Sequence, residues 1–271
     1  EPGVEFKTGW ALEAICEHLE AVTAGDIKRL IINVPPGMMK SLTTSVFWPA
    51  WEWTTMPHLR VLSTAYKTDL AERDSKKFGN LVTSEAYKTI YRDVFRTTKA
   101  TTTDVENNHF GFRKAMAFQS LTGSRGNRVV IDDPLSVDQA KSATELRNVA
   151  DTFTEAVPSR LNDPEKDAIV MIMQRLHQLD PSGLALDNNL GYEFLMLPME
   201  FEVSRRCHTS IGFSDPRTYE GELLFPERFS REVVDRDKHV MSSVNGTYAV
   251  AGQYQQRPAP RGGGMFKREW F

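Results

Sequence analysis

A chain of 271 residues is long enough to bury one large α/β domain, or one domain with an appendage. Its composition, 40% hydrophobic and 25% charged, is ordinary for a soluble globular protein, and no apolar run approaches the ~18 residues that span a bilayer. The net charge of −3 argues against a uniformly basic nucleic-acid coat. The two cysteines, Cys16 and Cys207, have no metal-ligand spacing and fit a reducing compartment.

The first elements follow from hydrophobic periodicity. Apolar residues recur at helical spacing over residues 8–22, and Gly25 is the expected stop. The apolar run at 29–34 predicts a short buried strand. After Ser41 the pattern becomes helical again, and Pro49 is expected to kink or end that helix because proline cannot donate a backbone hydrogen bond.

A second strand is predicted over residues 60–66 and a helix over 68–82. Thr68 is the expected N-cap of this helix, and Asp69 is placed to pair with Arg73 four residues later.

The middle of the chain continues the alternation of strands and helices. A strand pair is predicted within residues 109–123, a core strand at 127–134, a long helix at about 142–156, and further strands at 167–177 and 192–198. Because most of these strands are nearly continuous apolar runs, they predict a mostly parallel sheet with both faces covered by helices.

From about residue 207 the chain becomes rich in loops. Two helices are expected near residues 230–240 and 243–256, followed by a linker at 257–264. We therefore divide the chain into a core of residues 1–206 and a small subdomain with linker at 207–271.

The stretch "LIINVPPGMMKSLTTSVF" has the outline of a phosphate-binding loop. Backbone N–H groups at a helix start converge on an anion in such a loop, and a lysine reaches the outer phosphates. Only Gly37 is present of the usual glycines, and Met39 precedes the lysine. A surface lysine at a helix start is the alternative, although a cation there is unfavourable against the helix dipole. The predicted nucleotide contacts are Pro36, Gly37, Met38, Met39, Lys40 and Ser41.

Two acids end the strand "VVIDD". Asp132 can hold Mg²⁺ together with Ser41, and Asp133 can polarise an attacking water. The alternative is a turn or a helix cap, since "DDP" is favourable turn chemistry. A strand at 60–66 lies between the two motifs, as is typical of the P-loop class with an additional strand between them.

The strand at 167–177 ends in the polar residues Gln174 and Arg175. Gln174 is the candidate for a residue that senses the γ-phosphate. A strand that simply reaches solvent is the alternative.

Five segments, in this order and spacing, resemble the large terminase subunit of tailed bacteriophages: "LIINVPPGMMKSL", "VVIDDPLS", "MIMQRLHQLDPSG", "GELLFPERF" and "YAVAGQYQQRPAPRGGGMF". The resemblance implies an α/β P-loop ATPase that uses ATP and Mg²⁺ to drive double-stranded viral DNA into a procapsid. It implies the portal protein, the small terminase subunit and further copies of the chain in a ring as partners, no membrane, and the cytoplasm of the infected bacterium as location.

The family joins its ATPase to a nuclease domain of ribonuclease-H-like fold through a segment like "QQRP…GG". This chain ends just past that segment, at Phe271. We expect it to be the motor half alone.

Departures from the family pattern concern charge. Many relatives carry arginine at the position of Gly37, so Lys40 is the only cation in the loop, and Asp133 stands where many motors have Glu. Arg125, on a glycine-flanked loop, is the candidate for an arginine that reaches the neighbouring subunit's site. Arg128 is its rival, and an arginine that binds DNA or solvent is the alternative.

The remaining basic residues are expected to be solvated or to face DNA phosphates: Lys76, Lys77, Arg113, Lys114, Arg205 and Arg206. The tryptophans of "FWPAWEW" are expected to pack in the core and beside the adenine. Two other functions stay open. One is a helicase-like P-loop ATPase that remodels DNA, and the other is a non-catalytic protein with a decayed loop.

Overall fold

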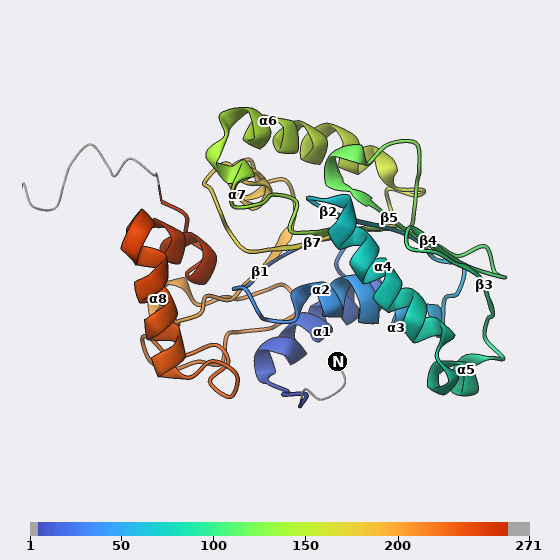
Figure 1. Cartoon of the computed structure of the whole chain (residues 1–271), viewed down its shortest axis with the longest axis horizontal. Coiled ribbons are helices and arrows are strands. Elements are labelled where there is room, and N and C mark those ends of the chain that lie inside the picture. Colours follow the sequence, from blue (N-terminus) through green and yellow to red (C-terminus); the bar gives the residue numbers. More distant parts are fainter. Residues whose placement is uncertain (1–4, 260–271) are drawn as a thin grey trace, which may run out of the picture.

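The computed structural model describes residues 5–259, apart from the side chains of residues 244 and 245. An eight-stranded sheet crosses the molecule in the order β3-β4-β5-β2-β6-β7-β1-β8 (Figure 1). All neighbouring strands from β5 to β8 are parallel, and β3 and β4 add an antiparallel edge. The strands are β1 (Arg29–Asn33), β2 (Arg60–Ala65), β3 (Thr97–Ala100), β4 (Asp104–Asn107), β5 (Phe112–Ala117), β6 (Arg128–Asp132), β7 (Ala168–Met173) and β8 (Glu193–Met196). The predicted mostly parallel α/β sheet is confirmed.

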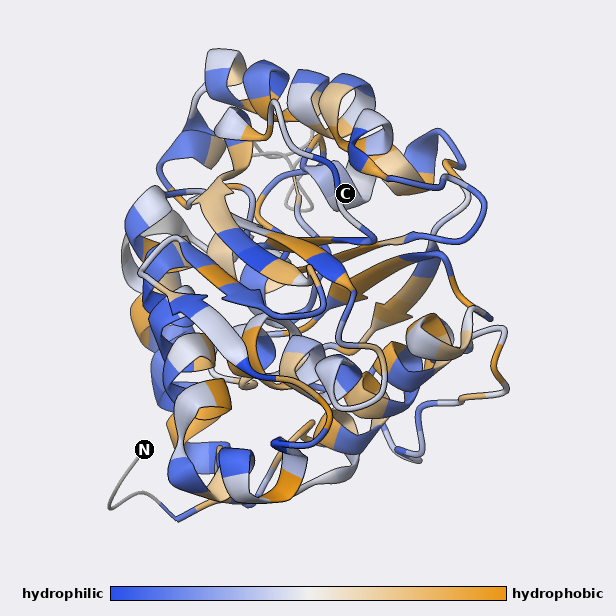
Figure 2. Ribbon diagram, turned by 90° about the vertical axis from the view of Figure 1, so that its right-hand side faces the viewer, coloured by the Kyte–Doolittle hydropathy of each residue, from blue (hydrophilic) through white to orange (hydrophobic). Residues whose placement is uncertain are grey.

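Helices cover both faces of this sheet, which therefore lies between two helical layers (Figure 2). The helices are α1 (Trp10–Ala24), α2 (Lys40–Leu42), α3 (Trp48–Trp53), α4 (Thr68–Thr83), α5 (Glu85–Tyr91), α6 (Ala143–Asp151), α7 (Pro181–Asp187) and α8 (Arg231–Asn245), and π-helical turns occur as η1 (Thr43–Phe47), η4 (Thr152–Ala156) and η7 (Val250–Tyr254).

Residues of β1 show how the two faces are filled. Leu30 and Ile32 pack in the same cluster as α1, whereas Ile31 packs in the cluster that contains α6. Successive strand residues point to opposite faces, so a strand covered on both sides must be apolar throughout. Gly25 ends α1 in the left-handed region at φ +91°, as its position in the sequence predicts.

The strand order brings the ends of three strands together. β7 lies between β1 and β6 in the sheet. The strand that separates the loop strand from the acid strand in space is therefore β7, although β2 is the strand that separates them along the chain. The C-terminal ends of parallel strands share one edge, so the residues after Asn33, Asp132 and Met173 meet there.

Pro49 does not end the helix that follows the loop. The chain stays helical from α2 through η1 to the end of α3, and the π-helical turn lies just before the proline. The Ser45 carbonyl, which Pro49 cannot reach with a hydrogen bond, accepts one from the Arg113 Nε at 3.0 Å instead. Arg113, expected to be solvated, is 0% exposed.

Three other local expectations are wrong. The hairpin in the middle of the chain pairs β5 with β4, which precedes the predicted segment 109–123, and residues after Ala117 leave the sheet. Thr68 begins α4 but does not cap it, because Lys67 occupies the cap position; Arg73 pairs with the adjacent Asp74 rather than with Asp69.

The C-terminal part packs against the same core as α1. Buried residues after residue 206 join this cluster: Cys207, Leu224, Phe225, Val234, Val250 and Tyr254. α8 and η7 form the two expected helical segments (Figure 1). The predicted linker lies mostly outside the described residues, which end at 259. Within residues 5–259 no helix is both long and apolar enough to span a bilayer.

A buried ion pair ties the start of β6 to α3, and it gives a stability prediction. Arg128 donates to Glu52 Oε1 through Nε at 2.9 Å and Nη2 at 2.8 Å, and the Glu52 side chain is 0% exposed. We expect Glu52→Ala to lower the free energy of unfolding by about 3–5 kcal/mol, because it leaves the buried guanidinium uncompensated. Chemical denaturation measures this, with Glu85→Ala as the control.

The control removes an exposed pair, since Glu85 contacts Lys88 with its side chain 94% exposed, and it should cost less than about 0.5 kcal/mol. Replacing both members of the buried pair, as Glu52→Leu with Arg128→Met, should recover most of the loss. An equal loss from the single and the double variants would contradict the charge argument.

Candidate nucleotide-binding site

The connection between β1 and α2 has the backbone of an anion-binding loop. Gly37 and Met39 both adopt left-handed conformations, at φ +81° and +55°. A Cβ on Gly37 would lie 2.7 Å from the Phe229 ring. Strain and crowding therefore both favour glycine at this position.

Lys40 points from the start of α2 toward the end of β6. It is 8% exposed, and its Nζ donates to Asp133 Oδ1 at 2.6 Å. Asp133 has φ +42°, a conformation uncommon outside glycine, and its backbone N–H donates to the Ile172 carbonyl at 2.9 Å. Its Oδ1 also accepts from the Gln174 N–H at 3.2 Å. The predicted lysine, acid and glutamine thus form one contact cluster.

Asp132 is buried beside this cluster. Burial, and then the charge of Asp133, raise the pKa of Asp132 to about 7, while Lys40 and the nearby Ser41 hydroxyl favour its ionised form. Its Oδ1 has no hydrogen-bond partner among residues 5–259. A buried carboxylate oxygen without a partner, next to a serine hydroxyl, fits a Mg²⁺ ion. No group of three metal-ligating side chains exists in the described chain, so phosphate oxygens and water would complete the coordination.

Gln174 and Arg175 have different surroundings at the end of β7. The Gln174 Oε1 is buried and has no partner in the described part of the chain, so this amide can accept a contact at the cluster. Arg175 is buried and pairs with Asp180, at 2.8 Å between Nε and Oδ1, and Asp180 in turn caps α7. Arg175 therefore holds the loop that follows β7.

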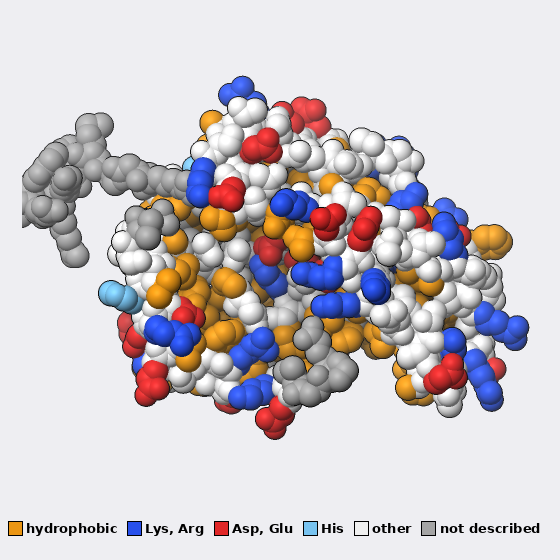
Figure 3. All heavy atoms as spheres, in the orientation of Figure 1, with side chains coloured by type: hydrophobic (Ala, Val, Ile, Leu, Met, Phe, Trp, Pro, Cys, Tyr) orange, Lys and Arg blue, Asp and Glu red, His pale blue; other side chains and the backbone are white. Residues whose placement is uncertain are grey.

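A cavity of about 740 Å³ opens over the loop and carries most of the predicted contacts. Gly37, Met39, Lys40 and Ser41 line it, together with further charged residues outside the loop: Glu5, Lys7, Arg73, Asp74, Lys77 and Arg228. Figure 3 shows Lys and Arg side chains gathered around the hollow at the centre of this face. The loop has one cation, but its cavity has five.

The sequence did not place these other cations at the site, and Lys77 was expected to be solvated or to face DNA phosphates. Arg73 and Lys77 are four residues apart on α4, and this spacing places them on the same side of the helix, so periodicity alone carried a signal for this pair. Lys7 and Arg228 lie far from the loop along the chain, and no local pattern connects them to it.

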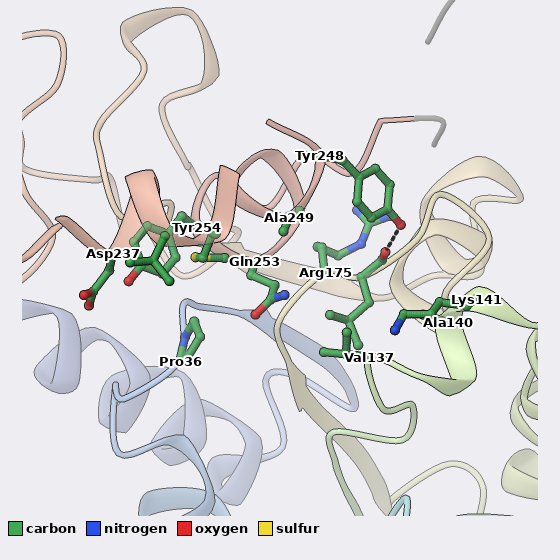
Figure 4. A pocket seen from close by; sticks show the side chains of 14 residues that line it. Pro36, Val137, Ala140, Lys141, Arg175, Asp237, Tyr248, Ala249, Gln253 and Tyr254 are labelled. Carbon is green, nitrogen blue, oxygen red and sulfur yellow. Dashed lines mark hydrogen bonds between the residues drawn. The ribbon is translucent and has the colours of Figure 1, made fainter. Parts of the chain in front are cut away.

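Pro36 and Met38 do not line that cavity. Met38 is 3% exposed and packs in the core cluster of α1. Pro36 lines a second cavity, of about 560 Å³, between the loop, the segments after β6 and β7, and the helices α8 and η7 (Figure 4). There the Tyr248 hydroxyl donates to the Leu176 carbonyl at 2.6 Å. The two sides of the loop thus face different cavities.

An apolar cavity of about 280 Å³ adjoins the phosphate side. It shares Phe6, Met39 and Phe47 with the larger cavity, and Trp48 and Trp51 also line it. Trp48 is 4% exposed and Trp53, outside the cavity, is 0% exposed. An apolar, aromatic-lined space of this kind can accept a nucleobase.

The two candidate arginines on the segment before β6 differ in exposure. Arg128 is 5% exposed and engaged by Glu52, so it cannot reach another subunit. Arg125 is exposed, and the neighbouring Gly126 and Asn127 hydrogen-bond to Arg160 and Arg60 where β6 begins. β6 separates this end from Asp132 by about 13 Å, longer than an arginine side chain, so Arg125 cannot act on the site of its own chain.

Comparisons with known proteins found similarity in structure but not in sequence. No family model matches the sequence, and no curated protein matches it. Among solved structures, the large terminase from a thermophilic bacteriophage in complex with ADP aligns at a TM-score of 0.45 and 8% identity, over 88% of this chain and 52% of that one. The same terminase in complex with ATP-gamma-S aligns at a TM-score of 0.46 and 8% identity, over 88% and 51%. The chain spans about half the length of these structures, and it is similar in fold to this phage large terminase.

Proposed function

We propose that this chain is the ATP-hydrolysing motor domain of a phage large terminase, which drives double-stranded DNA into a procapsid. The observation that carries the proposal is the cluster of Lys40, Ser41, Asp132 and Asp133. Segments 93 residues apart bring together a lysine and a hydroxyl that line one cavity and the two carboxylates that these groups contact, Asp133 beside Lys40 and Asp132 beside Ser41. This is the set of groups that phosphoryl transfer from ATP requires.

Each group has a role that follows from its position. Lys40 would leave Asp133 for the outer phosphates, because a triphosphate offers it more negative charge than one carboxylate does. Asp133, released from the lysine, would then orient and polarise the attacking water. Ser41 and Asp132 would hold Mg²⁺, which neutralises charge on the phosphate oxygens. Gln174 donates its backbone N–H to Asp133, and its buried amide oxygen has no partner among residues 5–259, so it would respond to the γ-phosphate.

The base would lie in the apolar cavity beside Met39. Its walls come from α1, η1 and α3, so a purine could pack there while its phosphates extend over the loop toward Lys40. This assignment gives Trp48 and Trp51 the role of packing beside the base.

The packaging role rests on the order of the five sequence segments that resemble terminases. DNA, the portal protein, the small terminase subunit and a ring of identical subunits are accordingly the proposed partners. A helicase-like ATPase would have the same site, so strand separation is the assay that distinguishes the two functions.

Lys40→Ala tests the proposal. We expect it to lower MgATP hydrolysis by more than about 10²-fold, because a preorganised cation at the phosphates is lost. The fold should remain, as judged by circular dichroism. Lys76→Ala, which removes an exposed lysine of α4 outside the cavity, is the matched control and should hydrolyse ATP like the parent chain. Unchanged turnover in Lys40→Ala would refute the nucleotide site, and DNA unwinding by the parent chain would favour the helicase-like function.

A further inference from the structure

Arg73 lies on the wall of the phosphate cavity that α4 provides. It lines the same 740 Å³ space as Lys40 and Ser41, and its side chain is 49% exposed. Lys40 belongs to the loop and contacts Asp133. Arg73 instead lies on α4, the helix that follows β2. It is therefore a cation of the same chain that is not part of the loop motif.

Its orientation is set by the neighbouring acid. Arg73 Nε donates to Asp74 Oδ1 at 3.0 Å and its Nη2 donates to Asp74 Oδ2 at 2.9 Å. Asp74 is 3% exposed, so this bidentate contact fixes the guanidinium plane against a buried anchor. The third nitrogen, Nη1, makes no hydrogen bond or ion pair within the described residues, and its donors remain available for a ligand.

A second arginine, Arg113, interacts electrostatically with Asp74. Arg113 is fully buried, and burial lowers its pKa to about 10, while the charges of Asp74 and Asp132 partly offset this effect. Its Nη2 donates to the Ser63 hydroxyl at 2.9 Å. Asp74 thus interacts with a buried cation as well as with Arg73. Asp74 therefore keeps a nearby positive charge when Arg73 contacts a ligand, so a phosphate contact need not break the Arg73–Asp74 pair.

We propose that Arg73 is a second cation for the terminal phosphates of the nucleotide, positioned by Asp74 and acting within its own subunit. The inference rests on the proposed nucleotide site and deepens it. The left-handed backbone at Gly37 and the nearby Phe229 ring disfavour an arginine in the loop, and the Arg73 guanidinium on α4 supplies the planar donor that the loop lacks. Arg73 takes the charge-compensating role that Lys40 alone cannot fill.

The test measures binding and turnover separately. Arg73→Gln should lower kcat/KM for MgATP by about 10²-fold, because one preorganised donor at the transferring phosphoryl group is lost. Its affinity for ATPγS, measured by calorimetry, should fall by about tenfold or more, while its affinity for adenosine stays unchanged, since the base does not contact Arg73. Arg73→Lys should recover only part of the loss, because an ammonium cannot contact Asp74 and a phosphate in one plane.

A loss of folding stability has to be distinguished from the loss of a phosphate contact, because Arg73→Gln leaves Asp74 without its ion-pair partner. The double variant Arg73→Gln with Asp74→Asn replaces the pair by two neutral amides that can hydrogen-bond each other, and the protein that is folded by circular dichroism should keep the full kinetic defect. Asp74→Asn alone should retain the arginine without its anchor, and should lower kcat more than ATPγS affinity. Lys76→Ala is the control on the same helix.

The outcomes distinguish this inference from the proposed function. If Lys40→Ala abolishes hydrolysis while the folded double variant works within about twofold of Lys76→Ala, Arg73 does not contact phosphate and only this inference is lost. If Lys40→Ala also leaves hydrolysis intact, the nucleotide site itself is wrong.

Discussion

Arg125→Ala is expected to remove the acceleration of ATP hydrolysis that comes with assembly, while leaving nucleotide binding unchanged. Arg125 is exposed and precedes the start of β6, at the end of this strand opposite the acids, so any role that it has in hydrolysis would be at the site of a neighbouring subunit. An arginine supplied in trans is worth about 10³–10⁵ in rate in other phosphoryl-transfer systems. The isolated chain should therefore bind ATP but turn it over slowly, and the rate per subunit should rise with protein concentration.

Mixing variants tests the trans geometry directly. Arg125→Ala subunits combined with Lys40→Ala subunits should regain activity, because each mixed interface can draw its loop from one chain and its arginine from the other. Arg147→Ala, an exposed arginine of α6, is the matched control and should assemble and hydrolyse normally. A dilute monomer that already hydrolyses ATP at the assembled rate would show that Arg125 is not needed.

The other cations of the phosphate cavity reduce the phosphate charge that Arg125 would have to compensate. With Arg73, Lys77 and Arg228 nearby, the charge on the phosphates is less poorly compensated than the loop alone suggests. The contributions of Arg73 and Arg125 can be distinguished by how the rate of hydrolysis depends on protein concentration. Loss of Arg73 should slow the dilute chain and the assembly by the same factor, whereas loss of Arg125 should slow only the assembly.

Asp133→Asn is expected to keep MgATP binding and to lower kcat by about 10²–10⁴-fold, because the amide cannot polarise the water as the carboxylate does. Asp132→Ala should instead lose the Mg²⁺-dependent part of nucleotide affinity. Calorimetry with and without Mg²⁺, together with single-turnover hydrolysis, separates the two effects. Normal hydrolysis in both variants would mean that these acids only form a turn.

The raised pKa of Asp132 adds a pH dependence to this prediction. Its ordinary value is 3.8 and its value here is about 7, so below pH 7 the carboxyl is increasingly protonated and cannot bind the metal. MgADP affinity should fall about tenfold per pH unit below 7 and be flat above it. Binding near pH 6.5 should release protons, detected by calorimetry in buffers of different ionisation enthalpy.

Asp132→Asn supplies the reference for that measurement, because its residual proton release reports only the ionisation of the nucleotide. Equal proton release from the parent chain and from Asp132→Asn would show that Asp132 is already ionised before the metal binds. The pH dependence would then have to be assigned to another group.

Local sequence patterns determined the elements of the site. Apolar runs identified β1, β6 and β7, because strands covered on both faces must be apolar along their whole length. Parallel strands end at a common edge, so the sequence alone predicts that the residues that follow them, Lys40 and Asp133 among them, lie close together.

Only the tertiary structure decided which other residues join the site. The positions of Arg73 and Arg228 in the cavity, and of the Phe229 ring against Gly37, depend on how distant segments pack, and periodicity within one segment does not encode this. The same holds for Arg113 and Arg128, which look like surface residues in the sequence but are buried. The Ser45 carbonyl and the Glu52 carboxylate, in the helical segment after the loop, accept hydrogen bonds from their guanidinium groups. A charged side chain can be buried when hydrogen-bond acceptors or opposite charges contact it, and the fold decides which residues provide these contacts.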